Sequence, residues 1–196
     1  MPLIPSLPET THLSDLLLRF PRHIEPLMAL NNSILRADGA LSFAERELIA
    51  AFVSGLNACN FCYGSHAIYA RAFGVDEDML QALVDDFDNA PIEDRYRPLL
   101  AYVRKLNTLP SKLVQADADA VFSAGWSEEA LVEAVEVTAM FNFMNRLIEG
   151  TGVNFDYGGD EARHTIASKD EDTLRDSYRL YGEKLIQMAT RAGSVE

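Results

Sequence analysis

The chain has 196 residues, of which 48% are hydrophobic and 24% charged, a composition typical of one folded domain with a sizeable core and not of a disordered chain. Its 17 basic and 30 acidic residues give a net charge of −13, and so acidic a surface disfavours binding to nucleic acid or to anionic lipid. No apolar run approaches the roughly 18 residues of a membrane span, and no signal-peptide pattern is visible at the start, so we expect a cytoplasmic protein.

The first 12 residues contain three prolines (Pro2, Pro5 and Pro8) and are expected to form an extended arm. After them, apolar residues recur at helical spacing and the alternation typical of strands is missing, which predicts an all-α fold. Ser42 and Glu45 have the spacing of a capping box, which marks a helix start. Helices are predicted over 12–20, 24–37, 43–55, 58–73, 77–87, 92–107, 112–124, 128–149 and 170–191.

We divide the chain into an extended N-terminal arm (1–12), a compact helical domain (13–158) and a C-terminal helical extension (159–196). The extension carries an apolar stripe at helical spacing, made of Leu174, Tyr178, Tyr181, Leu185 and Met188. Such a stripe can pack on its own domain or on a neighbouring subunit. We favour the neighbouring subunit, with the proline-rich arm as a strap, and therefore expect a homo-oligomer.

The two cysteines, Cys59 and Cys62, are three residues apart, which places both sulfurs on one face of a helix. Asn57 is predicted to cap that helix, so that Cys59 falls in the first turn, where free N–H groups stabilise a thiolate. His66 lies one turn beyond Cys62, where an imidazole can take a proton from the thiol. We favour a redox role for the pair. The alternatives are a structural role and a zinc site in which Glu47 could be the fourth ligand.

Glu47 lies on the preceding predicted helix. The rest of its helix face consists of small residues, namely Ala44, Ala51, Ser54 and Gly55. Small residues let another helix approach closely and partly bury the carboxylate, which would raise its pKa and make it a proton acceptor near neutrality. The alternative is a solvent-exposed glutamate.

The predicted helix over 128–149 is apolar around nearly its whole circumference from Val137 to Ile148, so we expect it to be buried. Its polar exceptions are Asn142, Asn145, Arg146 and Glu149. A buried arginine needs a carboxylate, which predicts an Arg146–Glu149 pair or a network between subunits. The alternative is that these residues face the cysteine site and orient Glu47.

The spacing from Glu47 to Cys59, Cys62 and His66 (12, 3 and 4 residues) resembles the alkyl hydroperoxidase D-like (AhpD-like) group of the carboxymuconolactone decarboxylase family, in its branch of peroxidase-related proteins. The resemblance continues through 70–74 and 141–147 and spans roughly residues 20–155. It implies an AhpD-like all-α domain with two related halves, assembled as a dimer, trimer or hexamer. It further implies catalytic roles for Cys59, Cys62, His66 and Glu47, with no cofactor and no metal.

The implied function is a thiol-dependent peroxidase acting on a small peroxide. Glu47 would polarise His66, and His66 would help to ionise Cys62, which attacks the O–O bond and becomes a sulfenic acid. Cys59 would close a disulfide, and an external dithiol or protein reductant would attack the more exposed sulfur, expected to be that of Cys59. An exchange of roles between the two cysteines remains open.

One residue departs from the family pattern: Phe61 stands where the best-known hydroperoxidases have a histidine immediately before the second cysteine, which bears on both activity and substrate. Three alternative functions stay open. They are a disulfide reductase, a decarboxylase or lactone-processing enzyme on the same fold, and a non-catalytic zinc-binding oligomer. The presence of two thiols argues against the decarboxylase, whose chemistry needs neither.

Overall fold

The structure, a computed structural model, describes residues 1–157 and 171–191 and contains only helices as regular elements in that part of the chain. The predicted all-α fold is confirmed. The α-helices are α1 (Leu13–Arg19), α2 (Ile24–Arg36), α3 (Phe43–Leu56), α4 (Asn60–Ala72), α5 (Glu77–Asp85), α6 (Tyr96–Thr108), α7 (Gln115–Ser123), α8 (Glu128–Thr151), α10 (Glu171–Arg175) and α11 (Ser177–Arg191). Two 3₁₀ turns, Pro21–His23 and Pro110–Lys112, precede α2 and α7.

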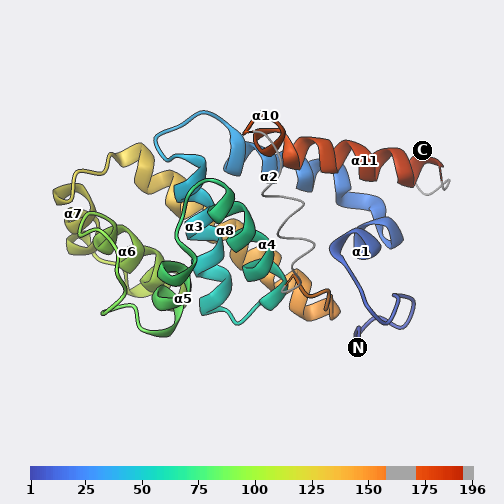
Figure 1. Ribbon diagram of the computed structural model, residues 1–196, viewed down its shortest axis with the longest axis horizontal. Helices are drawn as coiled ribbons and strands as arrows, with labels where there is room; N and C mark the ends of the chain where they lie inside the picture. The colour runs from blue at the N-terminus through green and yellow to red at the C-terminus, as the bar shows by residue number, and fades with distance from the viewer. Residues whose placement is uncertain (158–170, 192–196) are drawn as a thin grey trace.

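The helices form a central group with a smaller group at each end (Figure 1). Helices α3, α4 and α8 lie in the middle and pack on one another, while α5, α6 and α7 lie at one end. At the other end α11 runs along α2 and also contacts α1. Within the described residues no helix has both the length and the apolarity that crossing a membrane requires.

Helix α3 is the most deeply buried segment. Its residues from Leu48 to Val53 are each at most 4% exposed. The predicted capping box starts it: the Ser42 hydroxyl accepts from the Glu45 N–H at 3.2 Å, and the Glu45 carboxylate accepts from the Ser42 N–H at 2.8 Å. A helix enclosed on all sides can hold a charged side chain away from water, which is the setting of Glu47.

The turn from α3 to α4 sets the position of the cysteines. Ala58 has φ of 53°, a left-handed conformation that favours glycine. Its N–H donates to the carbonyl of Gly55 at 3.0 Å, and the Cys59 N–H donates to the carbonyl of Ser54 at 2.9 Å. These two hydrogen bonds together form a Schellman motif. The predicted Asn57 cap is wrong, because Asn57 ends α3 and Cys59 is the N-cap of α4.

The C-terminal apolar stripe packs within its own chain. Leu174 and Leu185 are 4% and 2% exposed, and Gly182 allows so close an approach that a Cβ there would lie 2.8 Å from the Cβ of Met28 on α2. The preference for a neighbouring subunit as the partner of this stripe is therefore wrong. The N-terminal arm likewise binds its own chain, since the Leu3 N–H donates to the Thr151 carbonyl at 3.1 Å.

Helix α8 is only partly buried, which corrects the prediction of an apolar helix enclosed on all sides. Phe143, inside the stretch from Val137 to Ile148, is 54% exposed, and Arg146 and Glu149 lie at the surface. Arg146 donates at 2.7 Å to the carbonyl of Asn142, four residues earlier, instead of pairing with Glu149. A surface arginine needs no buried carboxylate, so the predicted pair has no physical reason to form.

Candidate active site

Glu47 is the centre of the site and is completely buried on α3. One carboxylate oxygen, Oε1, pairs with the guanidinium of Arg36 from α2. The other, Oε2, lies 2.6 Å from Nδ1 of His66 on α4. The hydroxyl of Tyr178 on α11 donates to Oε1 at 3.4 Å. Three helices, α2, α4 and α11, thus each contribute one side chain to the buried carboxylate that α3 carries.

The pKa of Glu47 is lowered, contrary to the prediction. Burial alone pushes the pKa upward, but the positive charge of Arg36 and the interactions with His66 outweigh burial. The carboxylate therefore stays ionised near neutrality and holds its partners in place; it is not poised to accept a proton.

His66 is held in one orientation by this carboxylate. A neutral imidazole that donates its Nδ1 proton to Glu47 keeps a free lone pair on Nε2. The ring packs edge-on against Phe141 of α8, with 4.3 Å between the ring centres. Carboxylate and aromatic contact together leave Nε2 as the ring atom able to take a proton.

Arg36 is a site residue that sequence reasoning missed. Its side chain is 1% exposed, and besides Glu47 it donates to the carbonyls of Leu35 at 2.9 Å and Leu174 at 3.2 Å. The guanidinium carbon lies 4.7 Å from the centre of the Tyr178 ring. The available signal was weak: a basic residue directly after Leu35 on the apolar face of the 24–37 helix.

Tyr178 is the second site residue that was missed, although it was placed in the apolar stripe. Its hydroxyl lies 3.2 Å from Nδ1 of His66 as well as near Glu47. Burial, with the negative charge of Glu47 adding to it, raises its pKa well above the usual value, so the phenol keeps its proton.

The two cysteines differ in position. Cys59, the N-cap of α4, is 0% exposed, whereas Cys62 lies in the first turn of α4, is 3% exposed and borders a cavity. The pKa of Cys59 is raised, chiefly because its thiol hydrogen-bonds with Cys62 and also because it is buried. The expectations that Cys59 occupies the first turn and is the more exposed sulfur are therefore both wrong.

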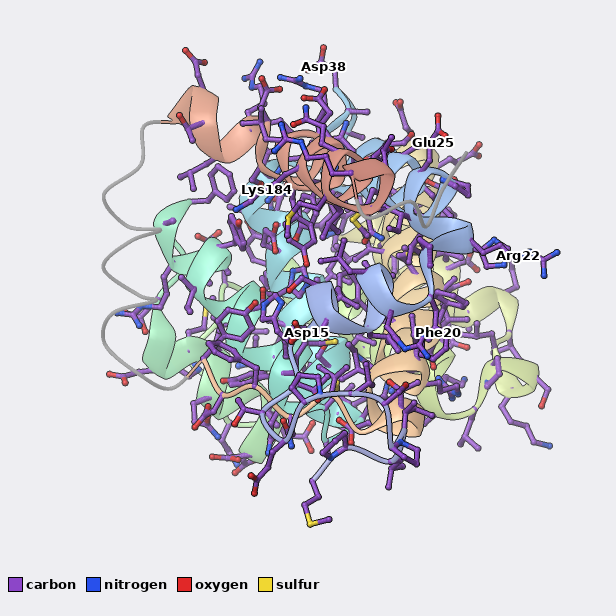
Figure 2. All side chains as sticks on the ribbon, turned by 90° about the vertical axis from the view of Figure 1, so that its right-hand side faces the viewer. Asp15, Phe20, Arg22, Glu25, Asp38 and Lys184 are labelled. Carbon is purple, nitrogen blue, oxygen red and sulfur yellow. The ribbon has the colours of Figure 1, made fainter. Side chains whose placement is uncertain are left out.

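The cavity has a volume of about 320 Å³ and lies between α4, α8 and α11. It is bordered by Cys62, Ser65 and His66 of α4, by Phe141 of α8 and by Tyr178 and Tyr181 of α11. Figure 2 views the molecule from the side on which α1 and α11 lie and labels Lys184, which also borders the cavity. Its walls are mainly apolar, as in sites for small organic molecules.

The structure brings all four predicted residues into one region, as two contacting pairs. Glu47 binds His66, and Cys59 hydrogen-bonds with Cys62. Cys62 and His66 border the same cavity, and none of the hydrogen bonds between described residues joins them. Arg36 and His66 each bind one oxygen of Glu47. Across 1–157 and 171–191 no three His, Cys, Asp or Glu side chains are grouped as metal ligands.

The buried asparagine of α8 braces the cysteine turn and does not contact Glu47. Asn145 accepts from the Asn57 amide at 2.9 Å and donates to the Ser54 hydroxyl at 3.1 Å. Asn107 of α6 exchanges hydrogen bonds with Asn57 on the other side. The orienting role predicted for these α8 residues thus applies to the turn before Cys59, while Arg36 orients Glu47.

Comparisons with known proteins give a family match and similar solved structures. Residues 21–86 match the sequence profile of the carboxymuconolactone decarboxylase family. An uncharacterized peroxidase-related protein from Silicibacter sp. TM1040 is 28% identical with a TM-score of 0.62, over 65% of this chain and 67% of that one. A second such protein, from Ralstonia eutropha JMP134 and described as an alkylhydroperoxidase AhpD core, is 22% identical with a TM-score of 0.70, over 80% of each chain. Among curated proteins none matches.

The resemblance inferred from the cysteine spacing is thus confirmed: the chain has the AhpD-core fold, and residues 21–86, which carry Glu47 and both cysteines, match the carboxymuconolactone decarboxylase family.

Proposed function

We propose that the protein is a thiol peroxidase that reduces an organic hydroperoxide with Cys59 and Cys62. The observation that carries this proposal is the shared cavity: Cys62 and His66, one helical turn apart on α4, both border a mainly apolar space large enough for a small organic molecule. The family match and the peroxidase-related structural neighbour add support.

Cys62 is the cysteine that attacks. It lies in the first turn of α4, where free N–H groups stabilise a thiolate, and Nε2 of His66 takes its proton. The thiolate attacks the terminal oxygen of R–O–O–H, so that an S–O bond forms as the O–O bond breaks. Cys62 loses two electrons and becomes a sulfenic acid, and the departing R–O⁻ is protonated to an alcohol by the proton that left Cys62.

Cys59, which is more deeply buried than Cys62, then forms a disulfide with it. Its raised pKa keeps it a thiol until the sulfenic acid has formed. Its sulfur then displaces hydroxide from Cys62, and the released hydroxide takes up the Cys59 proton to form water, leaving a disulfide. A dithiol reductant attacks the Cys62 sulfur, because that sulfur borders the cavity, and restores both thiols.

Peroxide consumption by the full chain tests the proposal, with dithiothreitol as reductant and cumene hydroperoxide as oxidant. We expect Cys62→Ser and Cys59→Ser to abolish turnover and His66→Ala to slow it by about 10²-fold, a typical effect of removing a general base. The exposed His23 offers a matched control, and His23→Ala should retain the parent rate.

Two results would contradict the proposal. Consumption at the parent rate by Cys62→Ser would exclude Cys62 as the attacking thiol. A parent protein that leaves hydroperoxide intact but reduces a small disulfide in the presence of dithiol would instead be a disulfide reductase.

A further inference from the structure

His12 and Tyr157 form a pair beside Cys62 at the edge of the cavity. His12 precedes α1 and Tyr157 follows α8, and their Nε2 and hydroxyl atoms are 2.7 Å apart. Both residues border the cavity together with Cys62. Each packs edge-on against the ring of Phe61, with 5.2 Å between ring centres. An imidazole from a distant segment thus lies against the residue that replaces the histidine of the best-known hydroperoxidases.

The hydrogen bonds of His12 determine where its proton sits. The N–H of Ser14 donates to its Nδ1 at 3.1 Å, so Nδ1 is an acceptor. Burial lowers the pKa of His12 against the opposing charge of Asp15, which favours the neutral ring. A neutral ring with an accepting Nδ1 carries its proton on Nε2 and donates it to the oxygen of Tyr157.

Tyr157 consequently has a hydroxyl proton to give. Burial raises its pKa to about 12, so the phenol is protonated at neutral pH. Its oxygen already accepts from His12, and its backbone is fixed against α4, where a Cβ at Gly64 would lie 3.0 Å from the Cβ of Tyr157. Ser65, which borders the same cavity, is a second hydrogen-bond partner of this hydroxyl. A molecule that enters the cavity can therefore accept the phenol proton beside Ser65 or in its place.

We propose that Tyr157, held by His12, donates a hydrogen bond to the oxygen that leaves the peroxide when Cys62 attacks. The inference rests on the thiol peroxidase function proposed above. As the O–O bond breaks, negative charge develops on R–O, and the phenol stabilises that charge without losing its own proton. The alcohol receives the proton that Cys62 gave up, so the balance of the reaction is unchanged. His12 is a positioning residue, because it acts through Tyr157.

The dependence of the rate on the leaving group tests this role. An alkoxide leaving from tert-butyl hydroperoxide needs strong stabilisation, whereas a carboxylate leaving from peracetic acid needs little. We expect Tyr157→Phe to slow Cys62 oxidation by tert-butyl hydroperoxide about 10²-fold, the usual effect of removing one donor to a developing oxyanion, and by peracetic acid less than about threefold. Tyr96→Phe, which removes a phenol that binds Glu45 and does not border the cavity, should leave both rates unchanged.

His12→Asn provides the second variant, because asparagine is a good N-cap for α1 but is too short to reach Tyr157. It should show the same selective loss with the alkyl hydroperoxide, to a smaller extent. Equal losses with both oxidants, or no loss with either, would overturn the role of Tyr157 while leaving the peroxidase function intact. A parent protein that reacts with neither oxidant would overturn the proposed function, and this inference with it.

Discussion

Replacing Arg36 tests how far the Glu47 carboxylate depends on its guanidinium partner. The side chains of Glu47 and Arg36 are 0% and 1% exposed, so water solvates neither charge. Arg36→Met keeps the apolar stem but leaves the carboxylate, among the residues that the structure describes, with His66 and Tyr178 as its polar contacts. Opposite charges about 4 Å apart attract by about 4 kcal/mol at an effective dielectric constant of about 20. Breaking a buried pair by removing one partner typically costs about 3–5 kcal/mol.

We therefore expect Arg36→Met to lower the free energy of unfolding by about 3–5 kcal/mol, measured by urea denaturation at pH 7. The double variant Arg36→Met/Glu47→Gln should be more stable than Arg36→Met alone, because it no longer buries an unpaired charge. Arg179→Met is the matched control: it breaks exposed pairs with Asp176 and Glu183 and should leave the free energy of unfolding unchanged within error. A loss of less than about 1 kcal/mol for Arg36→Met, or a double variant no more stable than the single one, would refute this reasoning.

Three further predictions concern stability. Ala58→Gly should raise the free energy of unfolding by about 1 kcal/mol in urea, because glycine adopts a positive φ without strain; a loss of stability would contradict a strained turn. Gly182→Ala should lower the free energy of unfolding by about 1–2 kcal/mol, because the new Cβ would lie 2.8 Å from the Cβ of Met28. An unchanged free energy of unfolding would mean that α11 can shift freely on α2. Because the pKa of Glu47 is lowered, its stabilising effect is complete above the unfolded pKa of 4.5 and is lost as the pH falls through the folded pKa. The difference in free energy of unfolding between parent and Glu47→Gln should therefore narrow below about pH 4.5. A constant difference in urea denaturation from pH 7 to 3 would contradict an ionised Glu47.

Much of the fold could be predicted from local signals. Caps such as Ser42 with Glu45 act within a few residues, and the structure shows that box as expected. Among these caps the exception is the turn before Cys59, where Asn57 resembled a cap. The left-handed alanine at position 58 is set by how α3 and α4 pack, and an alanine gives no sign of it in the sequence.

The candidate site likewise contains residues that local spacing predicts and residues that only the packing of distant segments brings in. Cys59, Cys62 and His66 lie within one predicted helix, so helical spacing could place them together, whereas Glu47 of the preceding helix joined them through the family resemblance. Tyr178 reaches Glu47 from 131 residues away in the sequence, and Arg36 comes from a different helix. Periodicity indicates that a residue faces the core, but it does not say which buried charge will face it. For that reason the direction of the Glu47 pKa shift was predicted wrongly: burial was foreseen and the buried cation was not.

The attack of Cys62 on peroxide can be tested most directly by trapping its sulfenic acid. The Cys59→Ser variant would be treated with one equivalent of cumene hydroperoxide in the presence of dimedone, and the adduct would be located by mass spectrometry of peptides. We predict one dimedone adduct per chain, on Cys62, and none when His66 is also replaced by alanine within the same reaction time. The absence of an adduct in Cys59→Ser, together with an adduct on Cys59 in a Cys62→Ser variant, would contradict the central claim that Cys62 is the attacking thiol.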